Sequence, residues 1–120
     1  MNRSVLVAVN DLFFVGKIRS VAEQLGIRLT IVKQPDEVLA HVREAIPALM
    51  ILDLSDARLQ PLDLIGQIKS DAHLAGIKII GFYSHVQVDL YKQATDAGCD
   101  QVLAKSAFSQ MLPALLSQLA

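Results

Sequence analysis

The sequence predicts an α/β fold in which an open, doubly wound parallel sheet of five strands carries helices on both faces. Short apolar runs alternate with segments of helical periodicity, and this alternation repeats five times within 120 residues with short connections. The apolar runs are continuous or rich in β-branched residues, as in strands that are buried on both faces. A closed barrel of parallel strands needs eight such strand–helix units, so the open sheet is the economical arrangement.

Five apolar runs are predicted to be strands. Each is short and lies between segments that carry turn-forming or helical signals, as a buried strand should. They cover residues 5–9, 28–32, 48–52, 78–82 and 101–104.

The first two helices are predicted from apolar residues that recur at three- and four-residue steps. The first carries such residues from Leu12 to Leu25, and Gly26 supplies its stop. The second begins at residues 35–37 and ends near Pro47.

The last three helices follow from the same periodicity. The third carries Leu62, Ile65 and Ile68, with Leu74 as a candidate last member before Gly76. The fourth covers residues 88–97, and the last covers 108–119. Because Pro113 lies inside the last pattern and is harmless only in a first turn, this helix should either start after residue 107 or kink at the proline.

Composition narrows the class of protein. Hydrophobic residues make up 52% of the chain, but in short runs far below the roughly 20 residues that span a bilayer. No secretory signal pattern is seen. The single Cys99 excludes an internal disulfide and fits a reducing cytoplasm. A net charge of −1 without a basic run argues against nucleic-acid binding. We therefore expect one cytoplasmic domain over residues 1–120, with no membrane and no nucleic-acid partner.

Polar residues follow three of the predicted strands at equivalent places. Asp53 follows the third strand, Tyr83 and Ser84 follow the fourth, and Lys105 follows the last. Since the carboxyl ends of parallel strands share one edge, a carboxylate, a hydroxyl and an ammonium can converge there on a transferable anion. Each residue also has a simpler interpretation: Asp53 as a turn residue, Ser84 as a helix cap and Lys105 as an exposed loop lysine.

These residues and their surroundings resemble the response-regulator receiver domains of two-component signalling. The segments 51–55, 97–100 and 102–105 carry the resemblance, which covers essentially the whole chain. It implies a flavodoxin-like sheet of order 2-1-3-4-5, with Asp53 as the phosphoacceptor and Lys105 as the phosphoryl contact. Tyr83 falls on the position of the switch hydroxyl and Ser84 on the residue after it, and either could face the site.

The chain departs from the family where receivers bind a metal. Counting back from Gly26 places the family's acidic pair on Val9 and Asn10, with Asp11 one position out of register. A Mg²⁺ site would then retain Asp53, the Asn10 amide and a loop carbonyl such as that of Ser55, so Mg²⁺ binding should be weak. We also expect Lys105 to contact Asp53 and to lower the pKa of its carboxyl.

The resemblance implies a receiver domain in a phosphorelay with a degenerate metal site. Such a domain would not be an enzyme beyond autophosphorylation from a phosphodonor. Its partners would be a histidine kinase or phosphotransfer protein and a downstream protein, with the chain a monomer or weak homodimer. One alternative is a pseudo-receiver that binds proteins without phosphorylation.

Two further alternatives are a plain dimerisation module and a flavodoxin-like binder of a small ligand, although residues 10–14 are too apolar to wrap a phosphate. Either one of Phe13 and Phe14 packs in the core while the other covers the site, or an exposed phenylalanine marks a partner surface.

Overall fold

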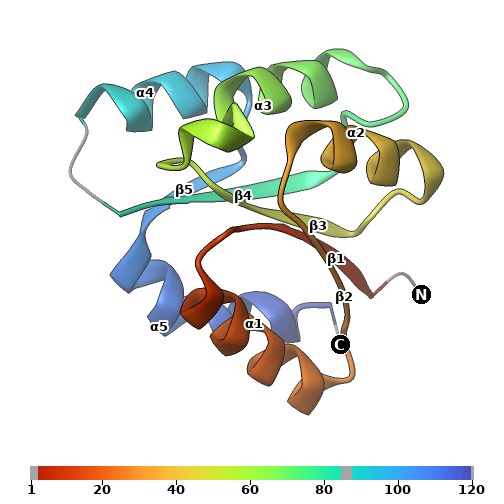
Figure 1. Cartoon of the computed structure of the whole chain (residues 1–120), viewed down its shortest axis with the longest axis vertical. Coiled ribbons are helices and arrows are strands. Elements are labelled where there is room, and N and C mark those ends of the chain that lie inside the picture. Colours follow the sequence, from red (N-terminus) through yellow and green to blue (C-terminus); the bar gives the residue numbers. More distant parts are fainter. Residues whose placement is uncertain (1–2, 85–87, 120) are drawn as a thin grey trace.

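The five strands form one parallel sheet in the order β2-β1-β3-β4-β5 (Figure 1). The computed structural model describes residues 3–84 and 88–119. The predicted sheet order is confirmed, and the strands start or end within one residue of the predicted runs. They are β1 (Ser4–Ala8), β2 (Arg28–Val32), β3 (Leu49–Asp53), β4 (Lys78–Tyr83) and β5 (Gln101–Ala104).

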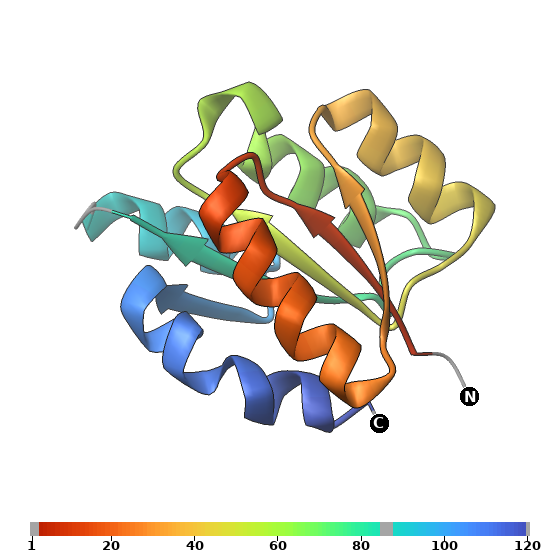
Figure 2. The same cartoon turned by 60° about the horizontal axis from the view of Figure 1, so that its bottom comes forward.

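Helices cover both faces of the sheet, as predicted (Figures 1 and 2). One face carries α2 (Pro35–Glu44), α3 (Pro61–Ser70) and α4 (Val88–Ala97). The other carries α1 (Leu12–Leu25) and α5 (Lys105–Ser117). A short 3-10 helix, η1 (Ala57–Leu59), follows β3 and was not predicted. Within the described ranges, no helix has the length and apolar character needed to cross a membrane.

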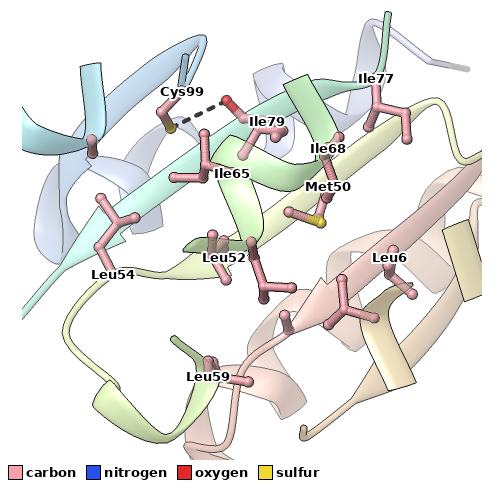
Figure 3. Close-up of a cluster of buried hydrophobic side chains, with 14 of the residues drawn as sticks. Leu6, Met50, Leu52, Leu54, Leu59, Ile65, Ile68, Ile77, Ile79 and Cys99 are labelled. Atoms are coloured by element: carbon pink, nitrogen blue, oxygen red, sulfur yellow. Dashed lines mark hydrogen bonds between the residues drawn. The ribbon is translucent and has the colours of Figure 1, made fainter. Parts of the chain in front are cut away.

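Successive strand residues pack alternately into two cores, one on each face of the sheet. On β3, Met50 and Leu52 pack under α2, α3 and α4, whereas Leu49 and Ile51 pack against α1 and α5. The first core is shown in Figure 3, where the Cys99 thiol also lies 3.5 Å from the Ile79 carbonyl oxygen. Burial on both sides explains why the strand sequences are continuously apolar, and Cys99 is a small core residue.

The ends of α1 follow the sequence signals, because each has a local hydrogen-bonding cause. The Asp11 side chain accepts hydrogen bonds from the backbone N–H groups of Phe13 and Phe14, and Asp11 is the N-cap. Gly26 adopts the left-handed conformation (φ 68°) that ends the helix.

Two helix ends differ from prediction. Helix α3 ends at Ser70, because the Asp71 side chain accepts a hydrogen bond from the His73 N–H and turns the chain. Leu74, the candidate last residue of this helix, is buried but belongs to the turn that follows it. Helix α5 begins at Lys105, so the first of the two alternatives, a start after residue 107, is wrong; the helix runs through Pro113, which is exposed, and the kink stays a prediction.

Candidate functional site

Asp53 ends the central strand at the carboxyl edge of the sheet. It is the only polar or charged residue among those described that is classed as buried, with 9% of its surface exposed. Its Oδ1 accepts a hydrogen bond of 2.9 Å from the Ser55 N–H. The strand position therefore holds a carboxylate at a fixed place, and burial there has to be offset by local contacts.

A cavity of about 350 Å³ opens over Asp53. Three chain segments build it: the turn between β1 and α1, the turn between β3 and η1, and the residue after β4. Its lining residues are Asn10, Asp11, Asp53, Ser55, Asp56, Arg58 and Ser84. The predicted convergence of distant residues at one sheet edge thus includes Asp53, Asn10, Asp11, Ser55 and Ser84.

Burial raises the pKa of the Asp53 carboxyl above its ordinary value. The Ser55 N–H opposes this change, since it donates to the charged form. The nearby charges act in opposite directions: Asp56 and Asp11 raise the pKa of Asp53, and Lys105 lowers it. The expectation of a lowered pKa was wrong, because the cost of burying the carboxylate exceeds the attraction of the lysine.

Lys105 pairs with Asp11, and no ion pair joins it to Asp53 within the described residues. Its Nζ lies 2.7 Å from Asp11 Oδ2 and 4.8 Å from the centre of the Phe14 ring. The predicted contact with Asp53 was wrong, because Asp11, as the cap of α1, faces the first residue of α5. This contact also lowers the pKa of the Asp11 carboxyl.

The residues between β1 and α1 do not all reach the cavity. Val9 is fully buried in the core beneath α1 and α5, whereas Asn10 and Asp11 line the cavity. Strand β1 ends at Ala8 and α1 begins at Leu12, so the turn is short and delivers Asp11 to the site edge. Asp11 therefore lies beside the site rather than outside it.

Ser84, not Tyr83, borders the Asp53 cavity. The Ser84 N–H donates to Ser55 Oγ at 2.9 Å, which joins the end of β4 to the turn after β3. Tyr83 packs against the core under α2–α4. Both residues, with Lys105, line a neighbouring cavity of about 570 Å³. Ser84 lines both cavities, the one over Asp53 and the one that Lys105 borders.

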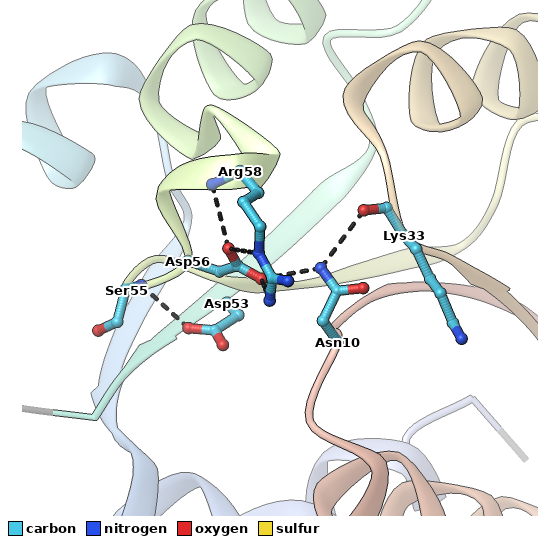
Figure 4. Close-up of polar contacts among 6 residues, drawn as sticks. All are labelled: Asn10, Lys33, Asp53, Ser55, Asp56 and Arg58. Atoms are coloured by element: carbon cyan, nitrogen blue, oxygen red, sulfur yellow. Dashed lines mark hydrogen bonds and ion pairs between the residues drawn. The ribbon is translucent and has the colours of Figure 1, made fainter.

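Two site residues were not singled out from the sequence, Asp56 and Arg58. Asp56 Oδ1 accepts from the backbone N–H and the Nε of Arg58, both at 3.0 Å. Its Oδ2 accepts from Arg58 Nη2 at 3.1 Å and from Asn10 Nδ2 at 2.8 Å (Figure 4). The available signal was their position, since both follow Asp53 closely at the ligand edge of the sheet.

The donor groups around Asp53 do not fit a resident Mg²⁺, which requires near-octahedral oxygen ligands. Asp11 and Asp56 are each held by a cationic side chain, Lys105 and Arg58. The Asn10 amide N–H groups point to Asp56 and to the Lys33 carbonyl. In the part of the chain that the structure describes, no group of three or more His, Cys, Asp or Glu residues is placed to hold a metal ion. Weak Mg²⁺ binding stays a prediction.

The two phenylalanines after Asp11 have different environments. Phe14 is buried, with its ring centre 4.8 Å from that of Phe82 and 5.6 Å from that of Phe108. Phe13 is 93% exposed and is not among the residues that line either cavity described above. One ring therefore packs in the core, as expected, and the other does not cover the site.

Comparison with known proteins identifies the fold. No family model matches the sequence, and the comparison with curated proteins gives no match. The solved structures that match include a response regulator from Hahella chejuensis, with a TM-score of 0.88 and 23% identity over 98% of this chain and 95% of that one.

Two further matches are the chemotaxis response regulator CheY4 of Vibrio cholerae and the Mn²⁺-bound form of the response regulator Rcp1. The first has a TM-score of 0.84 and 12% identity, and the match covers 100% of both chains. The second has a TM-score of 0.83 and 16% identity over 96% of this chain and 92% of that one. The chain therefore has the fold of response-regulator receiver domains, as the sequence resemblance predicted.

Proposed function

We propose that this chain is a receiver-type signalling domain in which Asp53 accepts a phosphoryl group. One observation carries the proposal: among the described residues, the only polar or charged residue that is buried as a whole is Asp53, whose carboxylate lies at the carboxyl end of the central strand beside a cavity. In this fold, ligands bind outside the carboxyl ends of the strands. A buried aspartate is costly for stability, so its retention there favours a chemical role over a turn-forming one.

The surrounding groups have roles in this proposal that follow from their positions. Asp53 is the nucleophile towards phosphorus, and Ser84 is the hydroxyl that can donate to a phosphoryl oxygen. Lys105 lies at the border of the neighbouring cavity and would have to exchange its contact with Asp11 for one with the phosphoryl group. The domain acts as a phosphoacceptor in the cytoplasm rather than as an enzyme that turns over a substrate.

The proposed partners are a phosphohistidine donor, either a histidine kinase or a phosphotransfer protein, and a downstream protein that reads the modified domain. The test is intact-protein mass spectrometry after incubation with acetyl phosphate, with peptide mapping of the adduct. We expect one phosphoryl group on Asp53 and none in Asp53→Asn. A folded protein that never acquires a phosphoryl group, from acetyl phosphate or from a phosphohistidine protein, would exclude this function.

A second candidate is a pseudo-receiver that binds a partner without phosphorylation, as a monomer or weak homodimer. The observation that favours it is the pairing of Asp11 with Lys105 and of Asp56 with Arg58, because both flanking carboxylates are then engaged by cations rather than open to a metal. The same mass spectrometry separates the two candidates. Sedimentation of the unmodified chain over a concentration series measures self-association.

A further inference from the structure

Arg58 lies beside the carboxylate that faces the cavity. It emerges from η1, and its Nε and Nη2 atoms donate to the two oxygens of Asp56 in a bidentate contact. Figure 4 shows its side chain turned back across the turn, towards Asn10 and Asp53. Asn10 shares Asp56 Oδ2 with Arg58 Nη2, so Asp56 fixes both groups at the cavity wall.

The guanidinium keeps unused donors in this position. Of its five N–H groups, the contact with Asp56 uses one on Nε and one on Nη2, which leaves three. The Arg58 side chain is 77% exposed, so it can adjust without disturbing the core. Asp56 is the main cause of the raised pKa of Arg58, and the Asp53 charge adds the smallest contribution. Arg58 and Asp53 line the same cavity.

We propose that Arg58 binds the phosphoryl oxygens at Asp53 and supplies the positive charge that a divalent metal would otherwise provide. This inference rests on the proposed phosphoacceptor function of Asp53. A guanidinium matches the spacing of two phosphoryl oxygens and stays charged at all relevant pH values. It carries one charge rather than two, so transfer should be slower than in a metal-assisted site, but independent of metal.

The chemical step balances without a metal. A carboxylate oxygen of Asp53 forms a bond to the phosphorus of acetyl phosphate while the bond between phosphorus and the bridging oxygen breaks. Acetate leaves with that electron pair, and no proton has to move. The products are the aspartyl phosphate and acetate, and Arg58 binds the oxygens on which negative charge is spread during the transfer.

The experiment measures the rate of adduct formation on Asp53 with acetyl phosphate, in excess EDTA and in Mg²⁺. We expect the wild-type rates in the two conditions to agree within about twofold. Arg58→Gln should lower the rate in EDTA at least about tenfold, as loss of a contact to a developing charge does. The rate of Arg58→Lys should lie between those of wild type and Arg58→Gln, because lysine keeps the positive charge but lacks the planar guanidinium that can donate two parallel hydrogen bonds. Arg43→Gln, an exposed arginine on α2, is the matched control and should behave like wild type.

A double variant separates direct contact from simple neutralisation of Asp56. If Arg58 only masks the charge of Asp56, then Asp56→Asn combined with Arg58→Gln should restore the wild-type rate. If Arg58 contacts the phosphoryl group, the double variant stays slow, which is the result we expect. Thermal unfolding of every variant confirms that the rates compare folded proteins.

The outcomes also separate this inference from the function on which it rests. Phosphorylation of Asp53 that requires Mg²⁺ and is unaffected by Arg58→Gln overturns the role of Arg58 and leaves Asp53 as phosphoacceptor. Full recovery in the double variant overturns it as well. Absence of any adduct on Asp53 in the folded wild-type protein overturns both.

Discussion

The raised pKa of Asp53 makes its ionised form a cost to the fold. An acid with a higher pKa in the folded state binds more protons when folded, so stability falls as pH rises from the unfolded pKa through the folded pKa. Above that window the cost is complete. Asp53→Asn removes the charge and keeps an oxygen that can accept from the Ser55 N–H. We expect it to raise the free energy of unfolding at pH 7 by about 1 kcal/mol.

Urea unfolding of Asp53→Asn and wild type at pH 7 and at pH 3 checks this prediction. The gain in the free energy of unfolding should be present at pH 7 and should shrink at pH 3, where Asp53 of the wild type is protonated in both the folded and the unfolded state. Asp36→Asn, an exposed acid in the first turn of α2, is the control and should lose a few tenths of a kcal/mol instead. A less stable Asp53→Asn at pH 7 would mean that Asp53 makes a favourable charge contact.

The contact between Lys105 and Asp11 leads to a second prediction. The hydrogen bond from Lys105 is the main reason why the pKa of Asp11 is lowered, so Lys105→Met should raise the pKa of Asp11 more than that of Asp53. The lowered pKa stabilises the fold above the unfolded pKa, and this contribution is lost as pH falls through the folded value. Since both side chains are partly exposed, the variant should lose no more than about 1 kcal/mol.

Carboxyl-carbon NMR titration of Asp11 and Asp53 measures both pKa values in one sample. The matched control is Lys17→Met, because Lys17 donates to the Ser109 hydroxyl rather than to a carboxylate. It should leave the Asp11 titration unchanged. A larger change at Asp53 than at Asp11 in Lys105→Met would show that the lysine serves the strand carboxylate in solution.

Single-residue reasoning located Asp53 because an acid at the end of an apolar strand is a strong signal. It chose the wrong partner for Lys105, since the ammonium can reach whichever carboxylate the nearest turn presents. That choice depends on the cap of α1 and on packing over Phe14, and neither is visible in strand spacing. Arg58 was missed for a related reason: its place beside the cavity depends on how η1 folds back on Asp56.

Strand β4 has a glycine where it passes the turn that follows Asp53. A Cβ at Gly81 would lie 2.7 Å from the Cγ of the Leu54 side chain, closer than real contacts allow. Leu54 is buried and immediately follows Asp53. We expect Gly81→Ala to cost about 1–3 kcal/mol through overpacking and to shift the amide signals of Asp53 and Ser55.

Gly76→Ala is the matched control, because its Cβ meets no atom within 4 Å and the residue precedes the strand. Denaturant unfolding and amide spectra of the two variants give both readouts. Stability of Gly81→Ala equal to wild type would show that Leu54 moves away freely. The turn after Asp53 would then be less tightly packed than the structure indicates.

Elements with both a periodic face and a local stop were predicted well. Helix α1 has Asp11 at one end and Gly26 at the other, so its bounds of Leu12–Leu25 follow from local chemistry. Helix α3 lacks a glycine at its end, and it stops where the Asp71 side chain accepts a hydrogen bond from the His73 N–H. Helix η1 is three residues long, which is too short to show periodicity, so it is visible only in the structure.

The assembled sheet decides what the carboxyl edge can do, because it brings the segments that follow β1, β3 and β4 together around one cavity. The sequence predicted that edge and most of its residues, since parallel order fixes which strand ends meet. It could not predict that each flanking acid is held by a basic side chain, Asp11 by Lys105 and Asp56 by Arg58. That pairing depends on side-chain directions in the folded molecule, and it is a second reason, beside the Val9 and Asn10 positions, to expect weak Mg²⁺ binding.

The stability of the whole domain should therefore not depend on Mg²⁺ in wild type and should become dependent when one acid is added to the site and one cation is removed from it. We choose Asn10→Asp with Arg58→Gln, which adds a carboxylate at the cavity wall and releases Asp56. Val9→Asp is not used, because Val9 is 0% exposed and a charge there would be buried in the core.

Without metal, the double variant should unfold at a lower temperature than wild type, because its carboxylates repel one another beside Asp53. Mg²⁺ at ten times its dissociation constant should raise the free energy of unfolding by about 1.4 kcal/mol, because it binds only the folded state. This corresponds to a rise of roughly 5 °C in Tm. Thermal unfolding in EDTA, in Mg²⁺ and in NaCl of equal ionic strength separates binding from charge screening. An equal rise in the Tm of wild type with Mg²⁺, beyond that in NaCl, would show that Asp11 and Asp56 give up their basic partners to a metal.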